Sequence, residues 1–386
     1  MTAFDSNLHG PERGTVKRRR VYYLSGFDPR GAAHYHRLYR DEAAKQAHML
    51  GVQIVTGSRR RRHHSASWQV ASRWGRHEVT TDYIFLGWDD VVREHWRGSH
   101  LCLVVQSFIG LAAFVRQGFF HGLRRANRGP FLSATFPFAS VILLAIAAVL
   151  LGGLAAQLAW YAGFRGWHAI GGAVLTSLVL LWAGMSWFDR IGVLWLLRIY
   201  RFAHRWGCRS LPTLDARMDE MAARIAKECR QYPADEILVV GHSVGTMVLV
   251  GVVARLLRAA PEGIPNLKLV TLGGCIPLLS RLRSAQAFRC DLRTVGHSCV
   301  YPWVDVAAQA DPLCFARMHP LAACGIALPH RPRQVIAKFF KLFSPTRYRA
   351  LQRDKMRLHF QYLMAADLPG EYDYFRLTAG PDPLQT

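Results

Sequence analysis

A serine between two glycines stands at the end of an apolar run. The pentapeptide Gly-His-Ser-Val-Gly occupies residues 241–245, with Ser243 at its centre. The residues before it, 236–240, have the pattern of a β-strand, and residues 246–257 have the pattern of a helix. A serine on such a turn needs strained dihedrals, and side chains at the two glycine positions would collide with neighbouring backbone. The pattern therefore predicts that Ser243 is a nucleophile.

A serine hydroxyl is a weak nucleophile until a base removes its proton, and an acid must hold that base in the correct tautomer. The strand, turn and helix around Ser243 resemble those of the α/β-hydrolase superfamily, in which the acid and then the histidine follow the serine along the chain. The resemblance covers roughly residues 20–95 and 212–365. It implies a serine hydrolase of the esterase or lipase type, and we expect no cofactor and no metal.

The acid should lie in a loop after a strand downstream of Ser243. Asp311 fits this place because it follows an apparent strand over residues 299–306. Asp305 is the competitor, but it lies inside that strand, where a structural role is favoured. Asp311 could also serve only as a turn former before Pro312. We predict that Asp311 is the acid.

The base should be a histidine beyond the acid. His319, His330 and His359 meet this condition. His359 lies near the end of the part that resembles the superfamily, where its members commonly carry the base, whereas His319 and His330 stand beside prolines in a loop. We predict His359 and keep the other two as alternatives.

Acyl transfer also needs N–H donors for the oxyanion of the tetrahedral intermediate. The resemblance implies that one donor is the backbone N–H of Val244, directly after the nucleophile. The second should come from the loop after an early strand, which here reads Leu-Ser-Gly-Phe over residues 24–27. Phe27 N–H is the expected donor. Ser25 replaces the histidine that often introduces this loop.

Strand and helix patterns alternate along the rest of the chain. Residues 21–24, 52–56, 82–88, 236–240 and 267–272 are predicted strands, and residues 32–50, 214–232 and 334–363 are predicted helices, the last with an interruption near Pro345. Such alternation is typical of a parallel sheet. We expect an α/β fold, similar to the α/β-hydrolases, with a mostly parallel sheet flanked by helices and a two-helix transmembrane insertion.

The insertion is predicted from two long uncharged stretches. Residues 138–161 and about 168–188 are each long enough to cross a bilayer, and Trp160, Tyr161 and Trp167 lie near the turn between them. Arginines flank the pair on both sides: Arg116, Arg124, Arg125 and Arg128 before it, and Arg190, Arg198, Arg201, Arg205 and Arg209 after it. The positive-inside rule then predicts a multi-pass protein of the cytoplasmic membrane with its catalytic domain on the cytoplasmic side.

These patterns divide the chain into five segments. We expect a disordered N-terminal tail over residues 1–16, hydrolase-like segments over 17–100 and 211–365, a membrane insertion over 101–210 with flanking interfacial helices, and a C-terminal tail over 366–386. Residues 101–115 are expected to form an interfacial or a buried helix. Residues 191–206 are expected to form an interfacial helix because apolar positions alternate with arginines, and a packed helix with one solvated face is the alternative.

The formal net charge of +23 predicts a polyanionic neighbour. Given the apolar hairpin, anionic membrane lipid is favoured, and we expect no nucleic acid because the basic run at residues 59–62 has no aromatic interleaving. The eight cysteines have no zinc-like spacing. The sequence thus predicts a membrane-anchored serine hydrolase that cleaves an ester, thioester or similar acyl bond of a small or lipid-like molecule. A non-catalytic membrane scaffold of the same fold is the alternative.

Overall fold

The computed structural model describes residues 15–121, 123–208, 211–298, 300–326 and 332–385. A single sheet lies at the centre of the body, with strand order β2-β4-β5-β1-β6-β7-β8-β9 and β3 paired to β4. The strands are β1 (Arg18–Leu24), β2 (Gln53–Thr56), β3 (Arg60–Arg62), β4 (Ser65–Trp74), β5 (His77–Leu86), β6 (Glu236–His242), β7 (Leu267–Leu272), β8 (Trp303–Ala307) and β9 (Arg333–Ile336). From β5 to β9 in this order the strands are parallel, whereas β2, β3 and β4 pair antiparallel.

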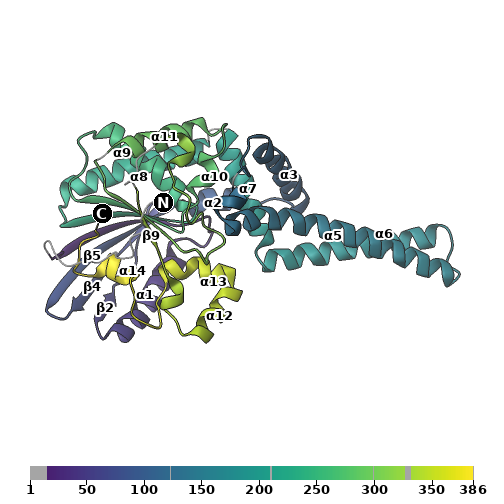
Figure 1. The fold of residues 1–386 in the computed structure, drawn as a ribbon, viewed down its shortest axis with the longest axis horizontal. Coiled ribbons are helices and arrows are strands. Elements are labelled where there is room, and N and C mark those ends of the chain that lie inside the picture. The colour runs from purple at the N-terminus through teal and green to yellow at the C-terminus, as the bar shows by residue number, and fades with distance from the viewer. Residues whose placement is uncertain (1–14, 122, 209–210, 299, 327–331, 386) are drawn as a thin grey trace.

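Helices cover both faces of the sheet (Figure 1). One face carries α8 (Pro212–Gln231), α9 (Gly245–Ala259), α10 (Ile276–Ser280) and α11 (Gln286–His297), and the other carries α1 (Gly31–Leu50), α12 (Pro345–Arg353), α13 (Lys355–Phe360) and α14 (Tyr374–Ala379). Alternate residues of β6 enter opposite layers: Val239 packs in one apolar cluster, and Leu238 and Val240 pack in the other. The predicted mixed α/β architecture with a mostly parallel, helix-flanked sheet is confirmed.

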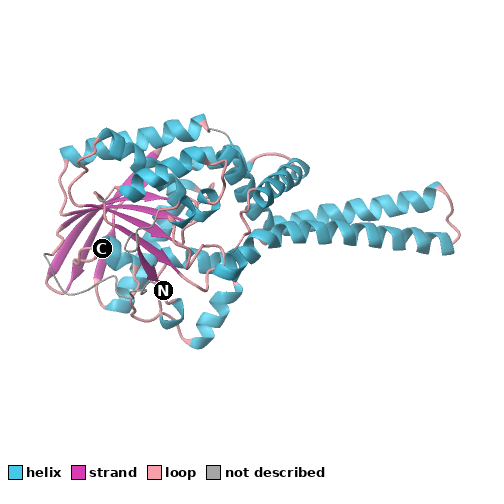
Figure 2. Cartoon of the chain, turned by 45° about the horizontal axis from the view of Figure 1, so that its top comes forward, coloured by secondary structure: helices cyan, strands magenta, loops and turns pink. Residues whose placement is uncertain are grey.

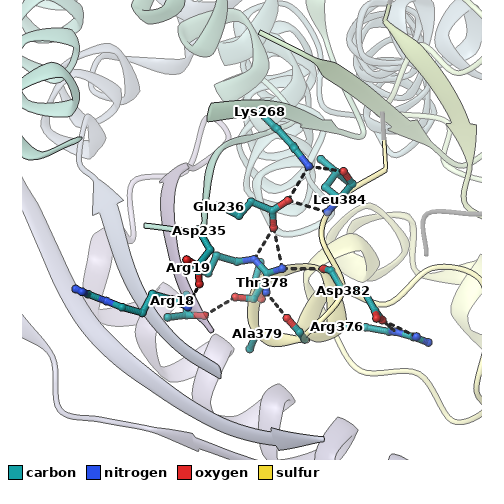
Figure 3. Close-up of polar contacts among 12 residues, drawn as sticks. Arg18, Arg19, Asp235, Glu236, Lys268, Arg376, Thr378, Ala379, Asp382 and Leu384 are labelled. Carbon is teal, nitrogen blue, oxygen red and sulfur yellow. Dashed lines mark hydrogen bonds and ion pairs between the residues drawn. The ribbon is translucent and has the colours of Figure 1, made fainter. Parts of the chain in front are cut away.

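The segment expected as a C-terminal tail, residues 366–386, is part of the body as far as residue 385. Arg19 on β1 is buried and pairs with Glu236 on β6 at 2.8 Å, and its guanidinium also donates to the carbonyls of Gly380 and Asp382 (Figure 3). A buried charge is stable only when its hydrogen-bonding groups are satisfied. The C-terminal segment supplies acceptors that the two strands lack. Of the expected N-terminal tail, residues 1–14 lie outside the described part of the chain.

Two long helices, α5 (Arg128–Tyr161) and α6 (Trp167–Arg190), project together from the body (Figures 1 and 2). Both are long and apolar enough to cross a membrane. In the most apolar stretch of 18 residues, only 17% of α5 and 6% of α6 is buried within the protein. They contain both expected spans. The short helices α2 (Asp89–Trp96) and α3 (His100–Arg116) meet at an angle of 102° and would qualify as one further span only if counted together. The structure thus favours membrane association.

Helix α7 (Val193–Cys208) is not the interfacial helix that its arginines suggested. It packs inside the body, and its Arg198 and Arg201 are 6% and 5% exposed. Arg198 pairs with Asp189 at 2.8 Å, and Arg201 donates to the carbonyl of His95. Because both guanidinium groups contact partners within the protein, the amphipathic pattern of α7 reflects internal packing at these two positions.

Candidate active site

Ser243 lies on a sharp turn between β6 and α9. Its φ angle is +56°, in the left-handed backbone region that residues other than glycine rarely adopt. A Cβ atom at Gly241 would lie 2.9 Å from the carbonyl oxygen of Gly245, and one at Gly245 would lie 2.4 Å from the carbonyl oxygen of Ser25. Both flanking positions therefore require glycine, as the sequence predicts for a strained nucleophile turn.

Asp311 and His359 meet on the carboxyl side of the sheet. Asp311 follows β8 by four residues and is fully buried, and its Oδ2 lies 2.7 Å from Nδ1 of His359 on α13. The second carboxylate oxygen accepts a hydrogen bond from Leu313 N at 2.9 Å. Nε2 of His359 is buried and has no hydrogen-bond partner within the described residues. This pair leaves His359 with one nitrogen available to another group.

Ser243 and His359 line the same cavity, whose volume is about 380 Å³. This volume falls in the range of small-molecule sites. In the observed rotamer, Ser243 Oγ lies 3.8 Å from Sγ of Cys275 and does not reach Nε2 of His359. Burial raises the pKa of the Cys275 thiol to about 12, so this neighbour is uncharged. The three predicted residues are thus brought together, with Ser243 Oγ turned toward the thiol.

The loop after β1 passes close to Ser243. A Cβ atom at Gly26 would lie 3.0 Å from Ser243 Cβ, so only glycine permits this approach. The adjacent residue Phe27 lines the same cavity, and its carbonyl accepts a hydrogen bond from Trp195 Nε1 at 3.0 Å. Neither Phe27 N–H nor Val244 N–H donates to a protein acceptor among the described residues. Both expected oxyanion donors thus belong to Val244, next to the serine, and to the loop that passes close to it, and neither has a protein acceptor within the described residues.

His242 is a residue of the site that the sequence analysis did not single out. It is the second residue of the pentapeptide, is buried, and its Nε2 donates to the carbonyl of His359 at 3.0 Å. Burial, and then the neighbouring charge of His359, lower its pKa to about 3, so it remains neutral. His242 thus holds the backbone at His359. Its place directly before Ser243 was the available signal.

The alternative residues do not join this cluster. Asp305 points from β8 to Thr271 Oγ1 at 2.6 Å and to Gln334 Nε2 at 3.5 Å. His319 Nδ1 accepts a hydrogen bond from the backbone N–H of Leu321 at 3.3 Å. His330 lies outside the described residues. Among the described candidates, only His359 and Asp311 form a pair.

The buried carboxyl group of Asp305 should contribute less to the stability of the folded protein at pH 7 than at pH 4. Burial raises its pKa to about 6, above the usual value near 3.9, so the folded state holds this proton more tightly than the unfolded state. Its contribution to the free energy of unfolding should fall by about 2 kcal/mol as pH rises from about 4 to 7. Asp305→Asn should remove this contribution, so the stability difference between variant and wild type should change by that amount between the two pH values. Urea unfolding at both pH values measures it. An Asn variant at the exposed Asp41 should keep the wild-type pH dependence.

One group outside the cavity could hold a metal ion by geometry. Donor atoms of His63, His64 and Glu220 lie within 4.8 Å of one another. However, the guanidinium of Arg217 also contacts Glu220, at 3.3 Å, and His64 already bonds to the same carboxylate at 2.9 Å. A cation would compete with both contacts. The group includes neither Ser243 nor His359.

Comparisons with known proteins do not place this chain in a family. No family model matches it, and no match is found among curated proteins or solved structures. Function is therefore inferred from the residues around Ser243 themselves.

Proposed function

We propose that this chain is a membrane-anchored serine hydrolase with an α/β-hydrolase-like fold, and that it cleaves an ester, thioester or similar acyl bond. The observation that carries the proposal is the 2.7 Å contact between Asp311 Oδ2 and Nδ1 of His359, a histidine that lines the same cavity as Ser243. The left-handed turn at Ser243 supports it, as do the N–H groups of Phe27 and Val244, which have no protein acceptor in the described part of the chain. Together these groups are a nucleophile, a base, an acid and two oxyanion donors.

Each residue has a distinct role in the proposed reaction. Ser243 Oγ rotates away from Cys275 and attacks the acyl carbon while His359 Nε2 takes its proton. Catalytic hydrogen bonds are often unformed until substrate binds, which is consistent with the observed rotamer. Asp311 accepts from Nδ1–H of His359 and stabilises the imidazolium. His359 then gives its proton to the leaving group, and a water molecule that it activates releases the acyl group from Ser243.

The two N–H donors act on charge that develops during the reaction. As the carbonyl becomes tetrahedral, its oxygen gains negative charge that the N–H groups of Phe27 and Val244 stabilise. Removing one such donor typically costs a factor of 10² to 10³ in rate. Because backbone atoms supply both donors, Ser25 in place of histidine leaves this role intact.

The membrane side of the proposal rests on the hairpin and on the walls of the cavity. Asp189 and Arg190 at the end of α6, and Trp195 on α7, line the cavity with Ser243. An acyl chain in the adjacent leaflet would thus be close to the nucleophile, which favours a lipid-like substrate. The arginines on both flanks of the hairpin favour a cytoplasmic location for the body and anionic lipid as its neighbour.

Fluorophosphonate probes test the proposal directly. The full chain in membranes should react covalently at Ser243, located by mass spectrometry of the labelled peptide. Ser243→Ala should remove all labelling. Ser298→Ala should label like the wild type, because its hydroxyl accepts a hydrogen bond from Val300 N and Ser298 is not among the described residues that line the cavity. A dodecyl probe should react faster than an ethyl probe if the substrate is lipid-like.

Two results would count against parts of the proposal. Folded wild-type protein that resists every probe would favour the non-catalytic scaffold. Labelling at Ser243 with equal rates for both chain lengths would support the hydrolase but not a lipid-like substrate.

A further inference from the structure

We infer that the apolar hairpin is part of the hydrolytic site as well as an anchor, because the body-proximal ends of α5 and α6 hold the acid loop and the oxyanion loop. This inference rests on the proposed function above. It assigns Ser133 and Trp195 as positioning residues. Ser133 lies near the start of α5, and Trp195 lies on α7, shortly after the end of α6; their contacts reach the two loops that flank Ser243 and His359.

The first contact joins α5 to the acid loop. Ser133 Oγ donates to the carbonyl of Pro312 at 2.6 Å, one residue after Asp311. Nearby, a Cβ atom at Gly129 would lie 3.2 Å from Pro312 Cα, so helix and loop are in close contact. Asn127, which caps the helix, also donates to the carbonyl of Ala316 at 2.8 Å. The body-proximal end of α5 therefore holds the loop that carries Asp311 in place.

The second contact joins the segment that follows α6 to the oxyanion loop. Trp195 lies five residues after the end of α6, and its Nε1 donates to the carbonyl of Phe27 at 3.0 Å. Its ring also lies beside His359, with centroids 6.5 Å apart. Trp195 thus fixes the peptide that precedes Asp28, within the loop whose Phe27 N–H is the proposed donor.

A series of side-chain contacts links α6 to the same loop. Asp189, in the last turn of α6, pairs with Arg198 at 2.8 Å. The guanidinium of Arg198 lies 4.7 Å from the ring centre of Trp96, and Trp96 stacks on Phe27 with centroids 5.8 Å apart. Arg198 is buried, which strengthens its cation–π contact, whereas the Asp189 side chain is 48% exposed, so solvent weakens the ion pair. Movement of the body-proximal end of α6 would therefore displace Phe27.

The consequence is that the seating of the hairpin controls the geometry of the site. Effective acyl transfer requires donors and base within a fraction of an ångström of their productive positions, and a displacement of about 1 Å can cost about 10²-fold in rate. The same hairpin ends form one wall of the cavity, through Asp189 and Arg190. The inferred substrate is therefore an acyl ester or thioester that enters from the bilayer alongside the hairpin.

The test compares phosphonate labelling rates of full-length variants in membranes. Ser133→Ala removes the hydroxyl that bonds to Pro312, and Trp195→Phe removes the N–H that bonds to Phe27. Each should lower the labelling rate at saturating probe by about 10- to 100-fold. For Ser133→Ala, the probe concentration that gives half the maximal rate should change little, because Ser133 is not among the described residues that line the cavity. Ser133→Thr, which restores a hydroxyl, should recover most of the rate.

Matched controls lie on the same hairpin. Ser186→Ala removes a hydroxyl that bonds only within α6, to the carbonyl of Trp182, and Trp187→Phe alters an exposed indole at 56% accessibility. Both should label like the wild type. Thermal melts show which variants are folded, and each of Ser133→Ala and Trp195→Phe tests one loop independently.

The outcomes separate this inference from the proposed function. If the wild type labels at Ser243 while Ser133→Ala and Trp195→Phe match their controls, the hairpin does not position the site and the inference is wrong, although the hydrolase stands. If the folded wild type never labels, the proposed function fails and the inference fails with it. A selective loss in both variants, with rescue by Ser133→Thr, supports the inference.

Discussion

Replacement of His359 by glutamine should lower the rate of acylation of Ser243 by about 10⁴-fold. Glutamine can still bond to Asp311 but cannot take a proton from the serine. The loss should be this large because no other described histidine pairs with Asp311, and His242, the nearest ring at 5.0 Å, is held by the His359 carbonyl. Phosphonate labelling rates of purified full-length protein measure the effect.

The controls for His359 decide between the candidate bases. His319→Gln and His330→Gln should each label within a few-fold of the wild type. Asp311→Asn should approach the loss seen for His359→Gln, because an amide at this position favours the wrong tautomer of the imidazole. A normal rate for folded His359→Gln, together with a large loss for either other histidine, would show that the base is assigned to the wrong residue.

The local part of the site could be predicted because its signal lies within a few residues. The turn at Ser243 requires a strand, two glycines and a helix in immediate succession, and β6 and α9 have the predicted order. The loop at Gly26 could be placed for the same reason. The partners of Ser243 are different, since His359 is more than 100 residues away and only the order implied by the resemblance favoured it.

The remaining differences arise where contacts between distant segments outweigh local pattern. Residues 333–336 form β9 rather than the start of a helix, because they pair with β8. The basic run near residue 60, which is not among the predicted strands, forms β3 by pairing with β4. The arginines of helix α7 suggest an interfacial helix from sequence, whereas in the fold Arg198 contacts Asp189 and Arg201 contacts the carbonyl of His95. None of these partners can be identified from a short stretch of the sequence.

Substitution of Gly245 by alanine should destabilise the protein by about 3 kcal/mol. The added Cβ would lie 2.4 Å from the carbonyl oxygen of Ser25 and 2.5 Å from that of Leu24. Both are backbone atoms of the central strand β1 and its loop, so neither can rotate away as a side chain would. The gain in helix propensity from alanine, at most about 1 kcal/mol, does not offset this collision. Denaturant unfolding in detergent measures the loss.

Gly274→Ala is the matched control, because its added Cβ would meet its nearest neighbours at 3.5 Å and 3.6 Å, ordinary contact distances. It should unfold near the wild-type midpoint. Equal midpoints for Gly245→Ala and Gly274→Ala would mean that β1 and the Ser243 turn are farther apart than described. If Gly245→Ala instead folds by displacing the turn, phosphonate labelling of Ser243 should fall with it, because the Phe27 loop and the nucleophile depend on the same close approach.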